Sequence, residues 1–166
     1  MKKKEKDQEK TIQDWLDEYG ESHQTPFNKK LHFICVPLIL FSLVGLLSYL
    51  SLGFLIEEYL PLYARFAHAG TLLMIIAISF YYKYSYNLFL GGAVVATITL
   101  MGNYYLGLYV PLWQASLVIF VLAWVGQFIG HHHEGKKPSF FDDLKYLLVG
   151  PAWILSFLYK KWGIKY

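Results

Sequence analysis

The sequence has 166 residues, enough for one domain of ordinary size, and a formal net charge of +3. Of its 27 charged residues (15 basic and 12 acidic), residues 1–30 hold 14, residues 31–130 hold four, and residues 131–166 hold nine. A soluble domain covers its surface with polar groups, which a hundred residues with four charges cannot do. The charge distribution therefore excludes a soluble globular domain and predicts an integral membrane protein.

Other classes of protein and site are also disfavoured. The lysines gather at the two ends without a basic stripe of interleaved aromatic residues, so we expect no nucleic-acid partner. Cys35 is the single cysteine, which excludes an intramolecular disulfide and any CxxC pair. It lies in an apolar run and is expected to be a small core or lipid-facing residue. Polar sequence continues to Lys30, unlike a cleavable signal peptide.

The first predicted element is a short amphipathic helix within residues 11–22. Its apolar side chains recur at the spacing of one helix face, and Thr11 with Asp14 is typical of a capping box. The helix either lies on the membrane surface or packs against the rest of the protein, and the sequence favours neither. Residues 1–30 are interpreted as a cytoplasmic N-terminal segment, and residues 31–166 as a single membrane-embedded domain.

Four apolar stretches follow, each long enough to be a membrane span. The first has 23 residues without a full charge, about 34 Å as a helix, which exceeds the hydrocarbon core of a bilayer. The third is rich in small residues, which allow close helix contact in lipid. The predicted spans are residues 31–53, 62–82, 87–106 and 108–130.

The last apolar segment, residues 144–159, is short for a span and is interrupted by Gly150-Pro151. With four spans, both chain ends lie on the same side of the membrane. Five lysines lie on that side, and Glu57 and Glu58 lie on the other. By the positive-inside rule, both ends are then cytoplasmic. A fifth crossing would place the C-terminal lysines outside. We therefore predict an all-α fold, a polytopic membrane helical bundle of about four transmembrane helices. An N-terminal amphipathic helix and a C-terminal re-entrant or interfacial helix complete it.

Five of the six histidines fall at one membrane face of this topology. His23 and His32 flank the entry to the first span, and the triplet at 131–133 follows the fourth. Imidazole is a common ligand for iron and zinc, so these residues are candidates for a metal site. Alternatively, each is an interfacial hydrogen-bonding residue, and a consecutive triplet cannot point all its members at one ion. His68 lies near the opposite face and is expected to be structural.

Two motifs at opposite ends of the chain resemble signatures of a known family. The first is Tyr19-x3-His23-x-x-Pro26-x-Asn28-x3-His32-x4-Pro37. The second is Trp124-x-x-Gln127-Phe128-Ile129-Gly130-His131, followed by Glu134-Gly135-Lys136-Lys137-Pro138 and Asp142. Together they resemble the 2-hydroxy fatty acid dioxygenase family, the membrane enzymes of phytosphingosine α-oxidation and their bacterial relatives. The resemblance covers essentially the whole chain.

The resemblance implies an Fe(II)-dependent dioxygenase that uses O2 to shorten a 2-hydroxy fatty acid by one carbon, without 2-oxoglutarate. By position, the metal ligands are His23, His32 and His131. Asn28, Gln127 and Glu134 would orient these ligands or the substrate. A competing arrangement replaces one histidine with Glu134. Departures from the family pattern, which bear on substrate detail, fall at Thr25, Cys35 and Ser156.

The resemblance also implies membrane lipid as the enzyme's surroundings, in a bacterial inner membrane or a eukaryotic endoplasmic reticulum according to the host. Oligomeric state stays open. A di-iron desaturase would need more histidines than the six present. The alternative from another class is a non-enzymatic small transporter or lipid-binding protein with interfacial histidines. The spans contain few polar groups near their centres, which disfavours a transporter.

Overall fold

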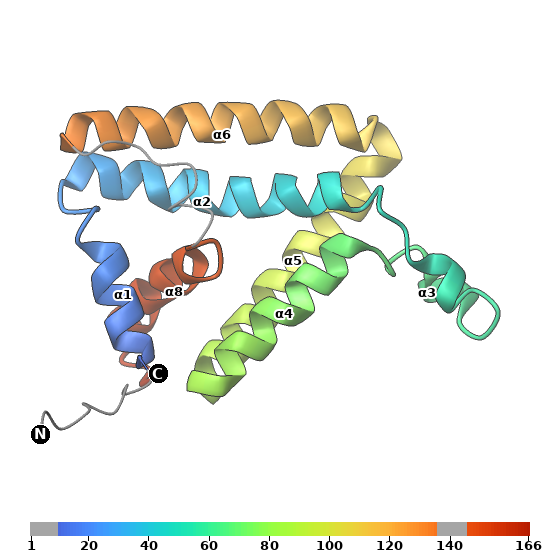
Figure 1. The fold of residues 1–166 in the computed structure, drawn as a ribbon, viewed down its shortest axis with the longest axis horizontal. Helices are drawn as coiled ribbons and strands as arrows, with labels where there is room; N and C mark the ends of the chain where they lie inside the picture. The colour runs from blue at the N-terminus through green and yellow to red at the C-terminus, as the bar shows by residue number, and fades with distance from the viewer. Residues whose placement is uncertain (1–9, 136–145) are drawn as a thin grey trace, which may run out of the picture.

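The computed structural model describes residues 10–135 and 146–166, and these residues form helices. A single isolated bridge between Ser51 and His68 is the only β-type pairing among them. Helices α2 and α6 lie side by side, and α4 and α5 form a second pair that runs obliquely to the first (Figure 1). The elements are α1 (Ile12–Gly20), α2 (Pro26–Leu47), η1 (Gly53–Leu55), α3 (Pro61–Ala64), α4 (Ala69–Tyr84), α5 (Tyr86–Tyr109), α6 (Leu112–Glu134) and α8 (Val149–Trp162).

Three helices, α2, α5 and α6, are long and apolar enough to cross a membrane. Their outward faces carry large exposed apolar side chains, such as Ile98 at 66% and Leu122 at 65% exposure, which suits contact with lipid. Helix α4 has 16 residues, about 24 Å, against a hydrocarbon core of about 30 Å. The described residues confirm the predicted all-helical fold, and these three helices support a membrane protein, whereas a fourth crossing stays a prediction.

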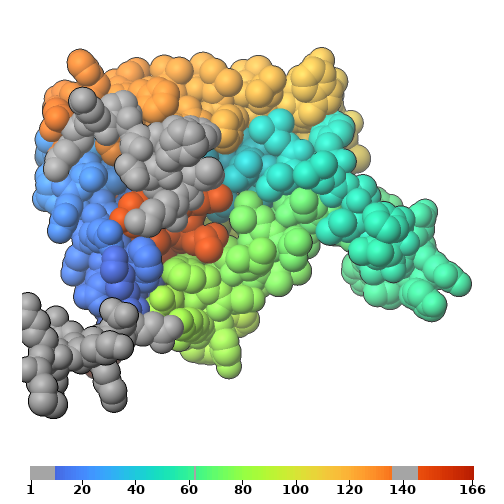
Figure 2. All heavy atoms as spheres, in the orientation of Figure 1, coloured from blue at the N-terminus to red at the C-terminus, as the bar shows by residue number. Residues whose placement is uncertain are grey.

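Two helices begin where local capping signals place them rather than at the edge of the apolar run. Helix α2 starts at Pro26, five residues before the expected span, because the Thr25 side chain accepts from the Asn28 backbone N–H and Pro26 suits the first helical position. Helix α4 starts at Ala69 instead of residue 62. Residues 62–64 belong instead to the short helix α3, which begins at Pro61. Helix α3 and η1 project from the rest of the molecule (Figure 2).

His68 explains the late start of α4 and has the structural role expected of it. Its buried ring accepts a hydrogen bond from the backbone N–H of Thr71 at 3.2 Å and caps the helix. Burial lowers the pKa of His68 below its ordinary value, which keeps the ring neutral and able to accept that bond.

Helix α1 packs against α8, as the second of its two predicted locations requires, and a position at the membrane surface stays a prediction. The capping box of Thr11 and Asp14 is present, and the buried face of α1 includes Leu16 and Tyr19. Tyr19 contacts Trp153 of α8 with ring centroids 5.5 Å apart. Helix α8 has 14 residues, about 21 Å, too short to cross a bilayer directly. Its re-entrant or interfacial character stays a prediction, and residues 144 and 145 lie outside the described residues.

Helices α2 and α6 approach closely because α6 presents glycines to α2. A Cβ atom at Gly126 would lie 2.6 Å from Cys35 Sγ, and one at Gly130 would lie 2.3 Å from Asn28 Oδ1. Cys35 is a buried core residue, as expected. Glycines four residues apart on one helix allow such contact in a membrane. This contact brings the start of α2 and the end of α6 together at one end of the molecule (Figure 1).

Candidate metal centre

Three buried histidines from distant parts of the chain meet at this end. His23 lies between α1 and α2, His32 lies in the second turn of α2, and His131 lies in the last turn of α6. Their ring centroids are 4.0 Å apart for His23 and His32, 5.1 Å for His23 and His131, and 5.0 Å for His32 and His131. These are the three residues predicted as metal ligands, and the fold brings all three together.

Backbone contacts orient two of the rings. The Nδ1 atom of His23 lies 2.5 Å from the Tyr19 carbonyl oxygen, and Nδ1 of His32 lies 3.0 Å from the Asn28 carbonyl oxygen. A neutral imidazole that donates from Nδ1 leaves the Nε2 lone pair free for a metal, and metal-binding histidines are commonly held in this way. Nε2 of His32 is buried, on the side of the ring opposite the bond to Asn28.

The spacing of the three rings is compatible with one ion. One nitrogen from each ring can be chosen so that all three lie within 4.8 Å of one another. Nitrogens that bind one ion at about 2.1 Å and at tetrahedral angles lie about 3.4 Å apart, so a pair at the upper limit of 4.8 Å would close by about 1.4 Å on binding. The donor set is neutral and fits a borderline divalent metal such as Fe(II). His23, His32 and His131 are therefore the residues that could hold it.

Asn28 connects the segments that carry all three histidines. Its backbone carbonyl accepts from His32, and its side-chain Nδ2 donates to the Ser22 carbonyl and to Glu134, each at 3.2 Å. Ser22 precedes His23, and Glu134 follows His131 by three residues. The side chain of Asn28 is completely buried. Asn28, predicted to orient ligands or substrate, thus lies where it can fix the mutual positions of the ligands.

Glu134 lies beside the histidine cluster and is engaged by the N-terminus of α2. Its Oε1 accepts from the Gln24 backbone N–H at 2.9 Å. Its Oε2 accepts from the backbone N–H and the hydroxyl of Thr25, at 3.0 and 2.7 Å, and from Asn28. A carboxylate at a helix N-terminus is also favoured by the helix dipole. Since its oxygens already accept these bonds, the geometry favours a clamp between α6 and α2 over the alternative of Glu134 as a ligand.

The remaining histidines of the triplet lie outside the cluster. His132 and His133 are exposed, and His133 packs against the Phe27 ring. Helix geometry separates consecutive side chains by about 100°, so only one member of the triplet can face the other ligands. Gly135, with φ of 74°, ends α6 immediately afterwards.

Two aromatic residues complete the surroundings of the site and were absent from the predicted site residues. The Tyr19 ring stacks on His23 with centroids 4.3 Å apart, and Trp153 lies 5.5 Å from His23. Tyr19 opens the first motif four residues before His23, and that spacing was the available signal. Trp153 belongs to α8, and nothing in the local sequence connects it with the histidines.

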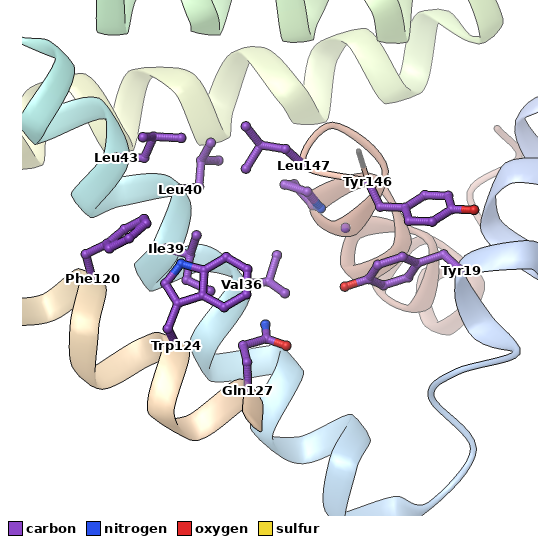
Figure 3. Close-up of a pocket in the computed structure, with 12 residues that line it drawn as sticks. Tyr19, Val36, Ile39, Leu40, Leu43, Phe120, Trp124, Gln127, Tyr146 and Leu147 are labelled. Atoms are coloured by element: carbon purple, nitrogen blue, oxygen red, sulfur yellow. The ribbon is translucent and has the colours of Figure 1, made fainter. Parts of the chain in front are cut away.

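An apolar cavity of about 130 Å³ is lined at one end by Tyr19, the residue that stacks on His23 (Figure 3). Gln127, one turn before His131 on α6, lines it together with Tyr19. The Oε1 atom of Gln127 is buried, and the Gln127 side chain interacts with the His32 ring. Gln127, the third residue predicted to orient ligands or substrate, therefore lies at the junction between the histidine cluster and an apolar space.

Replacing Gly130 by alanine should loosen the contact between α2 and α6. The new Cβ would meet the buried Asn28 side chain at 2.3 Å, so one of the helices must shift. We expect a loss of about 1–3 kcal/mol in the free energy of unfolding, with weaker metal binding because Asn28 holds His32. Thermal unfolding in detergent measures the first effect and metal titration the second.

The matched control is Gly107→Ala in α5, where the nearest atom to a new Cβ is Leu112 Cβ at 3.6 Å. This change should leave metal binding unaltered and stabilise the helix by up to about 1 kcal/mol. Equal effects of the two substitutions would show that the close approach at Gly130 is unimportant.

The fold and site define a helical membrane protein with a buried three-histidine cluster suited to a metal ion. A family model described as 2-hydroxy-palmitic acid dioxygenase Mpo1-like matches residues 9–162. The chain therefore belongs to the Mpo1-like family, which confirms the resemblance found in its two motifs. No curated protein and no solved structure matches the chain significantly.

Proposed function

We propose that this protein is an Fe(II)-dependent dioxygenase that converts a 2-hydroxy fatty acid and O2 into the fatty acid one carbon shorter, CO2 and water. The observation that carries the proposal is the buried cluster of His23, His32 and His131 in a chain of the Mpo1-like family. The reaction is balanced. The C1–C2 bond breaks, C1 leaves as CO2, C2 becomes the new carboxyl carbon, and one O2 takes up the four electrons. Neither 2-oxoglutarate nor an external reductant is required.

The three histidines would hold the iron. Bound there, Fe(II) would supply coordination positions for the substrate carboxylate and 2-hydroxyl and the redox chemistry that activates O2. The ligand set is uncharged, which leaves the positive charge of the metal available to an anionic hydroxy acid. Hydrogen bonds to the Tyr19 and Asn28 carbonyls hold the His23 and His32 rings in orientation.

The surrounding side chains would position the substrate and exclude water. The rings of Tyr19 and Trp153 pack against His23 and would limit the positions that its imidazole and a bound substrate can take. The buried side-chain oxygen of Gln127 would accept a hydrogen bond from the substrate 2-hydroxyl. The bound hydroxy acid would then extend its tail into the adjacent apolar cavity.

The predicted topology completes the proposal. By the positive-inside rule, the membrane face that carries the histidines is cytoplasmic, as are both chain termini. The substrate would then enter from the inner leaflet of a bacterial inner membrane or the cytoplasmic leaflet of an endoplasmic reticulum, according to the host. Labelling of one cysteine introduced at Lys30 or at Glu58, on opposite sides of this topology, tests the orientation, with the unchanged protein as the control for its buried Cys35.

The test of function is turnover by the purified protein. Protein in detergent, loaded with Fe(II), should convert 2-hydroxypalmitate to the acid one carbon shorter and release one CO2 for each O2 consumed. Mass spectrometry of the product and an oxygen electrode give both quantities. Absence of product from iron-loaded, folded protein would refute the dioxygenase assignment, and a strict need for 2-oxoglutarate would refute the proposed stoichiometry.

A further inference from the structure

We propose that the apolar cavity beside the histidines holds the acyl chain of the substrate, and that Leu43 and Phe120 at its far end select substrates by chain length. This inference rests on the proposed function, because it assigns the tail of the same hydroxy acid to a place in the fold. It adds specificity residues outside both sequence motifs.

Three segments form most of the walls of the cavity, and Tyr19 of α1 lines one end. Helix α2 contributes Val36, Ile39, Leu40 and Leu43, and α6 contributes Phe120, Trp124 and Gln127. Residues 146–151 close a third side. In Figure 3, Leu43 and Phe120 lie at the opposite end of the cavity from Tyr19. The end of the cavity at Leu43 and Phe120 is therefore apolar, whereas Tyr19 and Gln127 bring polar groups to its other part.

This polarity matches an amphiphile with its acidic head at the metal site. Tyr19 both lines the cavity and stacks on His23, so the cavity opens directly beside the ligands. Gln127 adds a buried acceptor at the same junction. An apolar tail that extends from this point gains about fourfold in binding for each methylene it buries.

On the predicted topology, with the histidines at one membrane face, the far end of the cavity would lie near the bilayer midplane. Leu43 follows His32 by 11 residues on α2, about 16 Å along the helix axis. One leaflet of a hydrocarbon core of about 30 Å is about 15 Å deep. A tail that starts at the histidines and follows α2 therefore reaches Leu43 and Phe120 at about the length of an acyl chain in one leaflet.

The small volume of the cavity makes Leu43 and Phe120 selective for the length of the acyl chain. A cavity of about 130 Å³ is close to the 150 Å³ of an engineered apolar cavity that binds benzene, so it encloses only part of a long acyl chain. Leu40, Leu147 and Pro151 separate it from a neighbouring void of only about 10 Å³. A longer chain must therefore pass Leu43 and Phe120, and the bulk of these side chains limits which chains are accepted.

The test compares chain-length profiles across a series of saturated 2-hydroxy fatty acids. Phe120→Ala should raise the ratio of kcat/KM for the longest acids to kcat/KM for the shortest by about tenfold or more. The space left by the phenylalanine ring would bury about two further methylenes of a long chain, and each buried methylene strengthens binding about fourfold. Leu43→Trp should shift the profile toward shorter acids. Phe128→Ala is the matched control, because Phe128 also contacts Trp124 from α6 but does not line the cavity. Its profile should equal that of the unchanged protein.

A binding measurement keeps the inference separate from the reaction. Trp124 lines the cavity. A 2-hydroxy fatty acid that carries bromine near its methyl end should therefore quench the fluorescence of Trp124. The Trp124→Phe variant identifies this contribution, because it lacks the Trp124 fluorescence and should show no such quenching. Unchanged length profiles in both Phe120→Ala and Leu43→Trp, with turnover retained, would overturn the inference and leave the proposed function intact. If the unchanged protein turns over no substrate, the proposed function fails, and quenching alone decides whether the cavity takes an acyl chain.

The same measurement distinguishes substrate from membrane lipid. In bilayers of unbrominated lipid, the brominated acid should quench Trp124, and an unbrominated 2-hydroxy acid should reverse the quenching. Quenching seen only in bilayers of brominated phospholipid, and not relieved by the hydroxy acid, would show a lipid chain in the cavity and overturn the proposal.

Discussion

Replacing any one of His23, His32 or His131 by alanine should abolish both iron binding and dioxygenase activity. The three imidazoles are the whole ligand set that the described residues bring together, and each is buried. Changing a group that merely supports a ligand commonly weakens metal affinity 10- to 100-fold, so loss of a ligand should cost at least about 100-fold. Iron content by mass spectrometry and the turnover of 2-hydroxypalmitate measure the two effects.

His132→Ala is the matched control for this series. It makes the same substitution beside His131 on the same helix turn, but at an exposed side chain outside the cluster. We expect full iron content and activity. His68→Ala should likewise retain iron, since His68 caps α4. Normal iron content in all three ligand variants would contradict the assignment of the site.

Replacing Glu134 by alanine should destabilise the fold and weaken iron binding without changing the number of irons bound. The substitution removes the acceptor for the backbone N–H groups of Gln24 and Thr25 and for the buried Asn28 side chain. Hydrogen bonds to a charged group contribute about 1.5–3 kcal/mol, so we expect a loss of roughly 2–3 kcal/mol in the free energy of unfolding. Chemical denaturation and Fe(II) titration provide the measurements.

The Glu134→Gln variant distinguishes a role of Glu134 as a clamp between α6 and α2 from a role as a metal ligand. An amide retains one acceptor oxygen at similar geometry, so the clamp role predicts partial recovery of both stability and iron affinity. Glu58→Ala, at an exposed acid between η1 and α3, should change neither quantity. If Glu134→Ala binds no iron while its unfolding free energy is unchanged, Glu134 is a ligand and the clamp interpretation is wrong.

Local patterns were sufficient for the helical membrane fold and for the start of α1. Charge distribution indicated the membrane class, and Thr11 with Asp14 forms the expected capping box. The second span was predicted to begin at residue 62, whereas α4 begins at Ala69, because most of residues 62–68 are apolar and continue the hydrophobic run. The break comes from Pro61 and from the His68 cap, which act on the backbone without altering hydropathy.

The sequence indicated which residues belong to the candidate site but not how they contact one another. Topology placed five histidines at one membrane face, and the resemblance to the family selected His23, His32 and His131 as ligands and Asn28, Gln127 and Glu134 as orienting residues. The bond from Thr25 to Glu134 joins residues 109 positions apart. The packing of Trp153 near His23 likewise depends on how α8 folds back. Such contacts are set by tertiary packing, for which a single sequence carries no local signal.

The central claim is that the three buried histidines bind the catalytic iron, and an iron-edge anomalous difference map of the iron-loaded protein tests it most directly. We predict one strong peak among the His23, His32 and His131 side chains, with Glu134 still bonded to Thr25. A peak at any other group of side chains, or one coordinated by Glu134 in place of a histidine, would contradict the claim.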